Sequence, residues 1–497
     1  MKQKQFPKTI IGSVTIYISL SLSLIISIIF YTLESCHLDA LVARSEGITY
    51  LTLDSLFAQY CLPLFEDYGL FCLNEQGLDL ENELKKYADY NSRTPASLLN
   101  NTSSFLNLSV NDVDITSVKY ITDDDGTNFV SQICDYVKYM ELTNYAETLC
   151  DQSNTSLPEV FTSSEDGTIN LDFNTIDMSK ANSLKDHDNN SSSNSDTPTS
   201  NINVSSNFKD NISSYIGHII KNGLLSFLVE KPSTVSTQKV NKESLPSVTC
   251  QLTEEGVAMS YGYFKDLSKT TLEKAYFCEY LYNTFDCYTS PANNSYLKYP
   301  IEYVIHGSDS DDINLINCCM QIINLRLSCN LLYLFTDKDK YADAKKAAEI
   351  VNVLNIPGAK YLAQVTILTI WATAEALLDT RDLLNGKNVP LIKSEKNWTL
   401  ELTDLLTFSK TTMSKNNGNN GLSYKRYLEL LLATENNISL YYRTMDLIQM
   451  NICHQYNEDF RLAKCVYSID AKFTYSLPYL FLSKKVIYTS KGHYNYQ

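Results

Sequence analysis

Hydrophobic residues form one long uninterrupted run near the start of the chain. The stretch Thr9–Leu33, TIIGSVTIYISLSLSLIISIIFYTL, contains 25 residues and no charge. At 1.5 Å per residue, a helix of this length would extend roughly 37 Å, which is enough to cross a bilayer with some tilt. A serine in such a helix can bond back to the preceding turn, so it need not stay unpaired in lipid. We therefore predict a transmembrane helix over residues 9–33.

The helical pattern continues beyond Glu34, the first charge after this run. No proline occurs between Pro7 and Pro63, and apolar residues recur at helical spacing while polar residues fill the other face. This is the pattern of an amphipathic helix. We predict one helix from about residue 10 to 62, whose outer part, 34–62, docks on a soluble domain.

The rest of the chain predicts a mainly α, α+β fold: a helical bundle with a small antiparallel β element. Residues 63–150 form an α+β region, in which 105–122 alternate as a pair of strands would. Residues 216–485 predict a mainly helical domain that ends in a strand over 465–481, and residues 296–307 also look strand-like. We expect the strand at 465–481 to pair with the region 105–122.

Two segments carry little apolar surface. Residues 151–215 include a long Asn-, Ser- and Asp-rich stretch, which cannot bury enough surface to offset the entropy of ordering. We interpret 151–215 as a disordered low-complexity linker. Residues 486–497 are interpreted as a C-terminal tail.

The charges that flank the apolar run predict its orientation. Lys2, Lys4 and Lys8 lie in the leader before it, and Glu34 and Asp39 follow it. The positive-inside rule then places residues 1–8 in the cytoplasm and the C-terminal domain outside. We expect a single-pass protein of the cell membrane, because no other uncharged stretch is long enough to span.

Three other fates of the N-terminus compete with a retained anchor. Signal-peptide cleavage is disfavoured, because the apolar run is too long and TLESCHLDA lacks an A-x-A-like site. Lipidation at Cys36 is disfavoured because Glu34 stands where the peptidase needs an apolar residue. Processing after Gly12 stays open.

Composition excludes some partners and leaves others open. The formal net charge of −16 argues against nucleic acid or anionic lipid as a ligand, because both need a basic patch. The 13 cysteines are odd in number and do not group by spacing. Cys134 with Cys150, Cys278 with Cys287, and Cys453 with Cys465 are candidate local disulfides, and the spacing selects none of them.

The sequence contains no motif for catalysis, a cofactor or a metal. The usual nucleophile, zinc-protease and phosphate-loop motifs are missing, and the six histidines are scattered. The acidic run HGSDSDD at 306–312 could ligate Ca²⁺, but its spacing fits no known loop. We favour the alternative that Ser308 or Ser310 caps the following helix. The prediction is therefore a protein that is not an enzyme.

Three charged residues interrupt otherwise apolar helical stretches: Arg326, Glu375 and Arg443. One reading makes them a binding pocket. The favoured reading is a structural ion pair, in which Glu375 meets Arg326 or Arg443, because a lone buried charge is costly.

Several stretches are similar to known proteins. The N-terminal segment GSVTIYISLSLSLIISIIFYTLESCHLDALVARSE, together with YPIEYVIHGSDSDDINL, GLSYKRYLELLL and RTMDLIQMNI, resembles a Firmicute (clostridial) family of exported single-span proteins of unassigned function. The N-terminus also resembles the TadE/TadG pseudopilins. Processing after Gly12 would place Tyr17 at the fifth mature position, where pilins usually carry glutamate.

The resemblance implies association with tight-adherence (Tad, Flp-type) pilus or secretion loci. The expected function is a non-enzymatic, membrane-anchored extracellular component or accessory of such an apparatus. Its expected partners are the membrane subunits of that system and the lipid bilayer. The alternative is an anchored ectodomain that binds or modifies an extracellular ligand.

Overall fold

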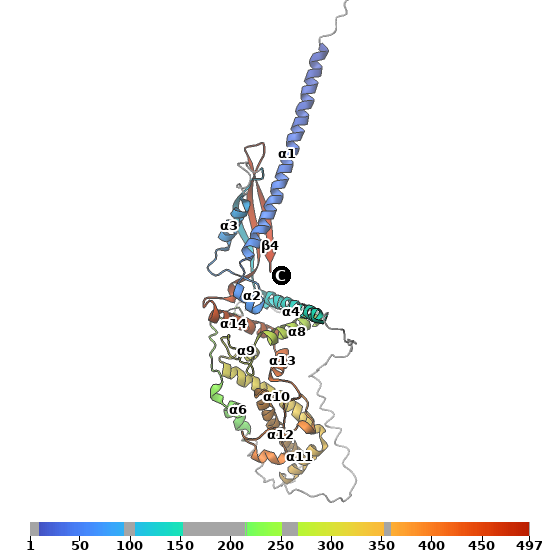
Figure 1. Cartoon of the computed structure of the whole chain (residues 1–497), viewed down its shortest axis with the longest axis vertical. Coiled ribbons are helices and arrows are strands. Elements are labelled where there is room, and N and C mark those ends of the chain that lie inside the picture. Colours follow the sequence, from blue (N-terminus) through green and yellow to red (C-terminus); the bar gives the residue numbers. More distant parts are fainter. Residues whose placement is uncertain are drawn as a thin grey trace, which may run out of the picture.

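One long helix, α1 (Thr9–Phe57), connects an exposed apolar segment to the folded part of the molecule (Figure 1). The computed structural model describes residues 9–93, 105–152, 214, 216–250, 267–351 and 359–496. The predicted continuous helix is confirmed, although it ends at Phe57 and not near 62. Cys61 is in an extended conformation, and the short helix α2 (Leu62–Tyr68) starts there with a proline in its first turn.

The second half of α1 packs along a small antiparallel sheet. Leu41, Leu53 and Leu56 are fully buried against this sheet and against α3 (Leu80–Ser92). The Thr49 hydroxyl also lies 2.9 Å from the Tyr475 hydroxyl on the sheet. The part of α1 after Glu34 thus docks on the folded part of the molecule as predicted, but only as far as Phe57 and not to residue 62.

The sheet is built around its longest strand, β3 (Cys465–Pro478). The strand β2 (Ser109–Tyr120) pairs antiparallel with one edge, from Ser109 opposite Ser476 to Tyr120 opposite Val466. The strand β4 (Lys485–Asn495) and the two-residue β1 (Leu73–Asn74) pair with the other edge. The predicted pairing of 105–122 with the C-terminal strand is confirmed.

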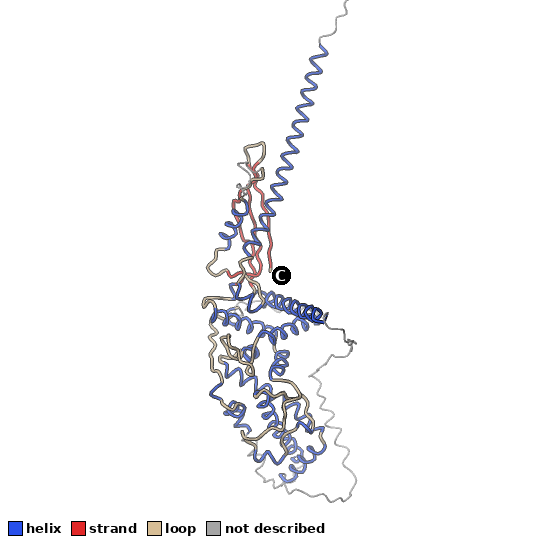
Figure 2. Tube along the Cα trace, in the orientation of Figure 1, coloured by secondary structure: helices blue, strands red, loops and turns tan. Residues whose placement is uncertain are grey.

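Helices make up most of the remainder, as Figure 2 shows, so the mainly α fold with a small antiparallel sheet is confirmed. The α-helices of this part, other than α2, are α4 (Asp123–Gln152), α6 (Leu224–Leu228), α7 (Pro246–Thr249), α8 (Leu267–Thr284), α9 (Pro300–His306), α10 (Asp311–Thr336), α11 (Lys338–Val351), α12 (Ala359–Leu384), α13 (Tyr424–Thr434) and α14 (Asn437–Gln455). Short 3₁₀ segments occur at 232–234, 395–397, 402–407 and 462–464, and a π-helical turn at 219–223.

Three local predictions are wrong. Residues 105–122 contain one strand, Ser109–Tyr120, and not a pair. The predicted tail at 486–497 is largely the strand β4. The strand-like stretch 296–307 contains the helix α9, because Pro300 starts a helical turn and Gly307, at φ +61°, ends it in the left-handed conformation.

Two hydrophobic cores divide the chain differently from the predicted domain ranges. One core is formed by buried residues of α1, α3 and the strands of the sheet. The other fills the helical part and takes residues from α2 and α4 as well as from 216–465. The region 63–150 therefore contributes to both cores. The linker predicted over 151–215 lies almost wholly outside the described residues.

Candidate functional site

The first half of α1 presents a continuous apolar surface. None of its most apolar 18-residue window is buried. The hydroxyls of Ser19, Ser21 and Ser27 donate to carbonyls three or four residues earlier, at 2.8–3.0 Å. These three hydroxyls are thus paired within the helix, which suits a lipid environment. This geometry is compatible with a membrane anchor.

Two further described helices are long and apolar enough to span, by length and composition alone. These are α10 and residues 360–384 of α12. In the fold, 72% of the most apolar α12 window and 39% of the α10 window are buried. Both helices belong to the helical core and pack on each other, which distinguishes them from the exposed half of α1.

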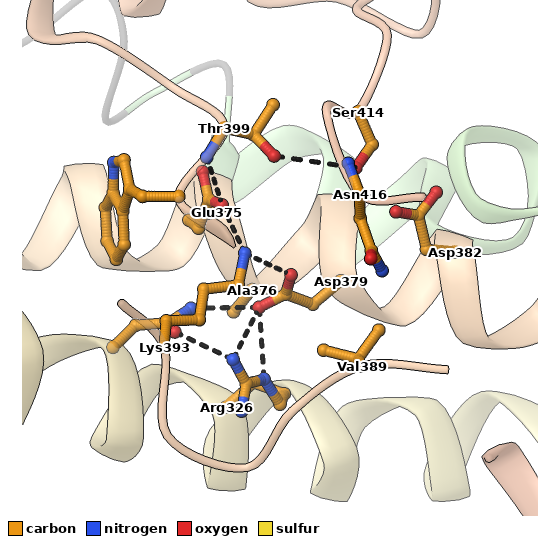
Figure 3. Close-up of polar contacts among 12 residues, drawn as sticks. Arg326, Glu375, Ala376, Asp379, Asp382, Val389, Lys393, Thr399, Ser414 and Asn416 are labelled. Atoms are coloured by element: carbon orange, nitrogen blue, oxygen red, sulfur yellow. Dashed lines mark hydrogen bonds and ion pairs between the residues drawn. The ribbon is translucent and has the colours of Figure 1, made fainter. Parts of the chain in front are cut away.

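Four charged side chains meet inside the helical core, between α10, α12 and the loop that follows α12 (Figure 3). We call Arg326, Glu375, Asp379 and Lys393 the ion cluster. Arg326 Nη2 lies 2.9 Å from Asp379 Oδ2, and Lys393 Nζ lies 2.6 Å from Asp379 Oδ1. Lys393 also pairs with Glu375. The four side chains are at most 2% exposed, and their charges cancel.

Backbone groups complete the hydrogen bonding of the ion cluster. Glu375 accepts from the backbone N–H groups of Thr399 and Leu400 at 2.9 and 3.0 Å. Arg326 donates to the carbonyls of Pro390 and Leu391 at 2.9 and 2.6 Å. The cluster therefore holds the loop after α12 against α10 and α12. Such full pairing is what makes buried charges tolerable.

The electrostatic surroundings of the two carboxylates in the cluster differ, so their pKa values shift in opposite directions. Burial raises the pKa of Glu375, and Lys393 offsets only part of this effect. Burial would also raise the pKa of Asp379, but Lys393 and Arg326 together hold it below its ordinary value. Asp379, which contacts both cations, is thus the central anion of the cluster.

The predicted ion-pair residues are brought together only in part. Glu375 and Arg326 share the cluster, but the basic partner of Glu375 is Lys393, which corrects the predicted arginine. Arg443 lies elsewhere, on α14, and donates to the carbonyls of Val304 and Ile305 at the end of α9. A cation at that place complements the helix dipole and pairs with free carbonyls.

Sequence reasoning missed two members of the cluster. Asp379 follows Glu375 by four residues and so shares its helix face, a signal that was available. Lys393 follows the helix in a loop, where periodicity carries no information.

A further buried carboxylate belongs to α9. Glu302 Oε1 accepts from the Tyr288 N–H at 2.9 Å and from the Tyr424 hydroxyl at 3.0 Å. Its Oε2 is buried and has no partner among the described groups. Burial raises the pKa of Glu302 from 4.5 to about 7. The folded protein therefore keeps this carboxyl protonated to a higher pH than an exposed glutamate.

The acidic run 306–312 lies at the start of α10, which begins at Asp311. Ser310 occupies the N-cap position, but its hydroxyl bonds to Asp312 Oδ1 at 2.5 Å and not to a helix N–H. Ser310 is thus the N-cap residue, but the prediction that its side chain caps the helix is wrong. Asp311 accepts from the Ser236 hydroxyl at 2.6 Å. Among the described residues, no group of three or more His, Cys, Asp or Glu side chains is placed to hold a metal ion.

The cysteines form no disulfide in the part of the chain that the structure describes. Twelve of them are free thiols, including both members of the candidate pairs 278 with 287 and 453 with 465. Burial raises the pKa of the Cys72 thiol well above its usual range. The side chain of Cys150, the candidate partner of Cys134, lies outside the described residues.

Arg443 also lines a surface pocket of about 220 Å³. Lys242 and the carboxylate of Asp446 face the same pocket. Asp446 accepts from the Ser247 N–H at 2.8 Å and the Tyr303 hydroxyl at 3.0 Å, so its bonding capacity is partly used. The reading of Arg443 as a pocket residue thus has a geometric basis.

Comparison with known proteins returns one family. Residues 203–477 match the model of a family of unknown function, DUF5702, which covers more than half of the chain. Neither the curated proteins nor the solved structures gave a match. The matched region contains the ion cluster and ends in β3, and it excludes α1. The chain belongs to this family of unknown function, DUF5702.

Proposed function

We propose that this protein is a non-enzymatic, membrane-anchored extracellular component or accessory of a Tad-like pilus or secretion apparatus. The observation that carries the proposal is the continuity of α1. One helix passes from an exposed apolar half into a half that is buried on the sheet. This two-part helix is the arrangement that the pseudopilin-like N-terminus led us to expect.

The docking of α1 supports a mechanical role. The backbone of β4 approaches α1 so closely that a Cβ at Gly492 would lie 2.6 Å from Leu53 Cδ1 and 2.7 Å from Thr49 Cγ2. Tyr488 on the same strand donates to Glu46 at 2.7 Å, and Tyr496 donates to the Phe57 carbonyl at 2.6 Å. A span that is held this firmly would transmit its position in the membrane to the whole ectodomain.

The exposed half of α1 is the surface that would contact membrane subunits. A photo-crosslinking amino acid at Tyr17 or Leu24, both exposed on the apolar half, tests this in native membranes. We expect adducts with other membrane proteins at these positions. The same group at Leu406, an exposed position of the helical part, is the matched control and should give none of these adducts. Adducts with lipid alone at both span positions would reject the proposal.

The pocket at Arg443 favours a second candidate, an anchored ectodomain that binds an extracellular ligand. Arg443 would suit an anionic group there, together with Lys242, whose ammonium also pairs with Asp309 at 2.6 Å. The candidate predicts that the purified protein retains a small anionic compound from the culture medium, and that Arg443→Gln loses it. Retention of the same compound by the variant would count against this pocket.

A further inference from the structure

The loop between β3 and β4 lies beside the exposed half of α1. Figure 1 shows this hairpin as the end of the sheet that points along α1 toward its apolar half. The loop is short, since the Tyr479 N–H donates to the Lys484 carbonyl at 3.1 Å and Pro478 pairs with Lys485. We call residues 479–484 the hairpin tip.

The hairpin tip is fixed to the end of the apolar run by two kinds of contact. Glu34 accepts from the backbone N–H groups of Leu480 and Phe481 at 2.8 and 3.1 Å. The ring of Phe481 packs edge-on against Phe30, with the ring centroids 4.8 Å apart. The first charge after the apolar run therefore binds the hairpin backbone, and the hairpin side chain reaches back onto the run.

The position of Phe30 gives the depth of this contact. Phe30 precedes Glu34 by four residues, which is about 6 Å along a helix. The uncharged run of roughly 37 Å exceeds a hydrocarbon core of about 30 Å, so its last turn lies at the boundary with the headgroups. Phe481, which touches Phe30, must reach the same level.

The chemistry of the hairpin tip suits that boundary. Phe481 and Leu482 are 48% and 56% exposed, although both are large and apolar. Aromatic residues are favoured at the membrane interface, where a ring can contact both chains and headgroups. Lys484 and Lys485 follow them and are exposed. At this depth the ammonium groups of the two lysines would contact the phosphates of the lipid headgroups, which is an attractive interaction. The lysines provide local positive charge on a protein whose net charge is negative.

We propose that the hairpin tip is a second membrane contact, in which Phe481 and Leu482 enter the outer interfacial layer beside α1. The partner is the lipid bilayer itself. The inference rests on the proposed anchoring by α1 and deepens it. Two contacts on one rigid unit would set the tilt of the ectodomain, whereas a span alone leaves it free to lean.

Tryptophan quenching in vesicles tests this contact on the full-length protein. The variant Phe481→Trp is reconstituted into phosphatidylcholine and phosphatidylglycerol vesicles whose acyl chains carry bromine near the glycerol. The two native tryptophans, Trp371 and Trp398, are buried in the helical core and give the background to subtract. We expect the added emission to be largely quenched by the brominated lipid.

Two matched variants make the result decisive. Met413 is 85% exposed, and the carbonyl of its neighbour Thr412 accepts from Arg381 of α12. The helix α12 lies at the end of the molecule away from α1 (Figure 1). The variant Met413→Trp should therefore keep its emission. Ile18→Trp, within the apolar half of α1, should be quenched. If Ile18→Trp is quenched and Phe481→Trp is not, the anchor stands and the hairpin contact is rejected. If neither is quenched, the anchoring and the contact are rejected together.

Discussion

At the residue scale, the ion cluster is a closed set of two cations and two anions. Removing Lys393 leaves Glu375 and Asp379 with only Arg326 for compensation. The loss of one partner from a buried pair costs about 3–5 kcal/mol, because the other charge stays buried and unpaired. We therefore expect Lys393→Met to lower the free energy of unfolding by about that amount, as measured by urea denaturation.

An exposed pair provides the control for this prediction. Lys360 pairs with Glu349 on the surface, where ion pairs contribute about 0–1 kcal/mol. Lys360→Met should therefore be nearly neutral. The double variant Lys393→Met with Glu375→Gln should cost less than the sum of the two single changes, because the pair is coupled. An effect of Lys393→Met as small as that of Lys360→Met would contradict a structural role.

Glu302 predicts a specific dependence of stability on pH. Its folded pKa, about 7, lies above the ordinary value of 4.5 because the carboxyl is buried. The folded state therefore holds the proton more tightly, and the stability from this group is fully present below pH 4.5 and is lost as the pH rises through 7. The shift corresponds to about 3 kcal/mol.

The variant Glu302→Gln keeps the shape of the side chain and removes its titration. We expect it to be as stable as the parent protein near pH 4.5 and more stable at pH 8. The difference in the free energy of unfolding between the two proteins is the quantity to measure. A difference that stays constant from pH 4.5 to 8 would show that Glu302 titrates normally.

The sequence allowed two of the four buried charges of the cluster to be found, but not their pairing. Glu375 and Arg326 were recognisable because each interrupts an apolar helical face. Lys393 was not, because a residue in a loop has no periodicity to interrupt, and its partner depends on how the loop folds back. Arg443 looked equivalent to Arg326 in sequence, yet it caps a helix end that the sequence had suggested was a strand.

At the element scale, the contact between α1 and β4 predicts opposite effects for two glycines. A side chain at Gly492 would overlap Leu53 and Thr49 on α1, so Gly492→Val should destabilise the protein by about 1–3 kcal/mol. Gly47 lies within α1 with open space around it. Gly47→Ala should stabilise the protein by about 0.5–1 kcal/mol, because glycine is entropically costly in a helix.

Thermal unfolding of the two glycine variants is the measurement. A lower melting temperature for Gly492→Val with a higher one for Gly47→Ala supports the close docking of the helix on the sheet. Equal melting temperatures for Gly492→Val and the parent would mean that β4 does not contact α1 in this way.

Elements with a long regular pattern could be predicted, and short ones could not. The helix α10 and the strand β3 carry enough residues for their periodicity to be clear. The seven-residue helix α9 is rich in aromatic and β-branched residues, which look strand-like. Its proline at the first turn and Gly307 after its end were the better signals. The strand β4 was missed because its alternation is largely polar.

At the scale of the whole molecule, the sheet joins segments from both ends of the chain. The family match ends in β3, but β3 pairs with β2, which lies before the matched region. The N-terminal part is therefore required to complete the sheet on which α1 docks. Long-range pairing of this kind could be predicted for β2 and β3 from their alternation, whereas the division into two cores depends on packing that no local pattern shows.

The topology of the full chain tests the central claim, that α1 spans the membrane with the folded part outside. A reporter enzyme that is active only outside the cytoplasm, fused after Gln497, is the measurement. We predict that this fusion is active, and that replacing Lys2, Lys4 and Lys8 by glutamate reduces its activity because the orienting charges are lost. A fusion that is inactive while a cytoplasmic reporter at the same position is active would contradict the account.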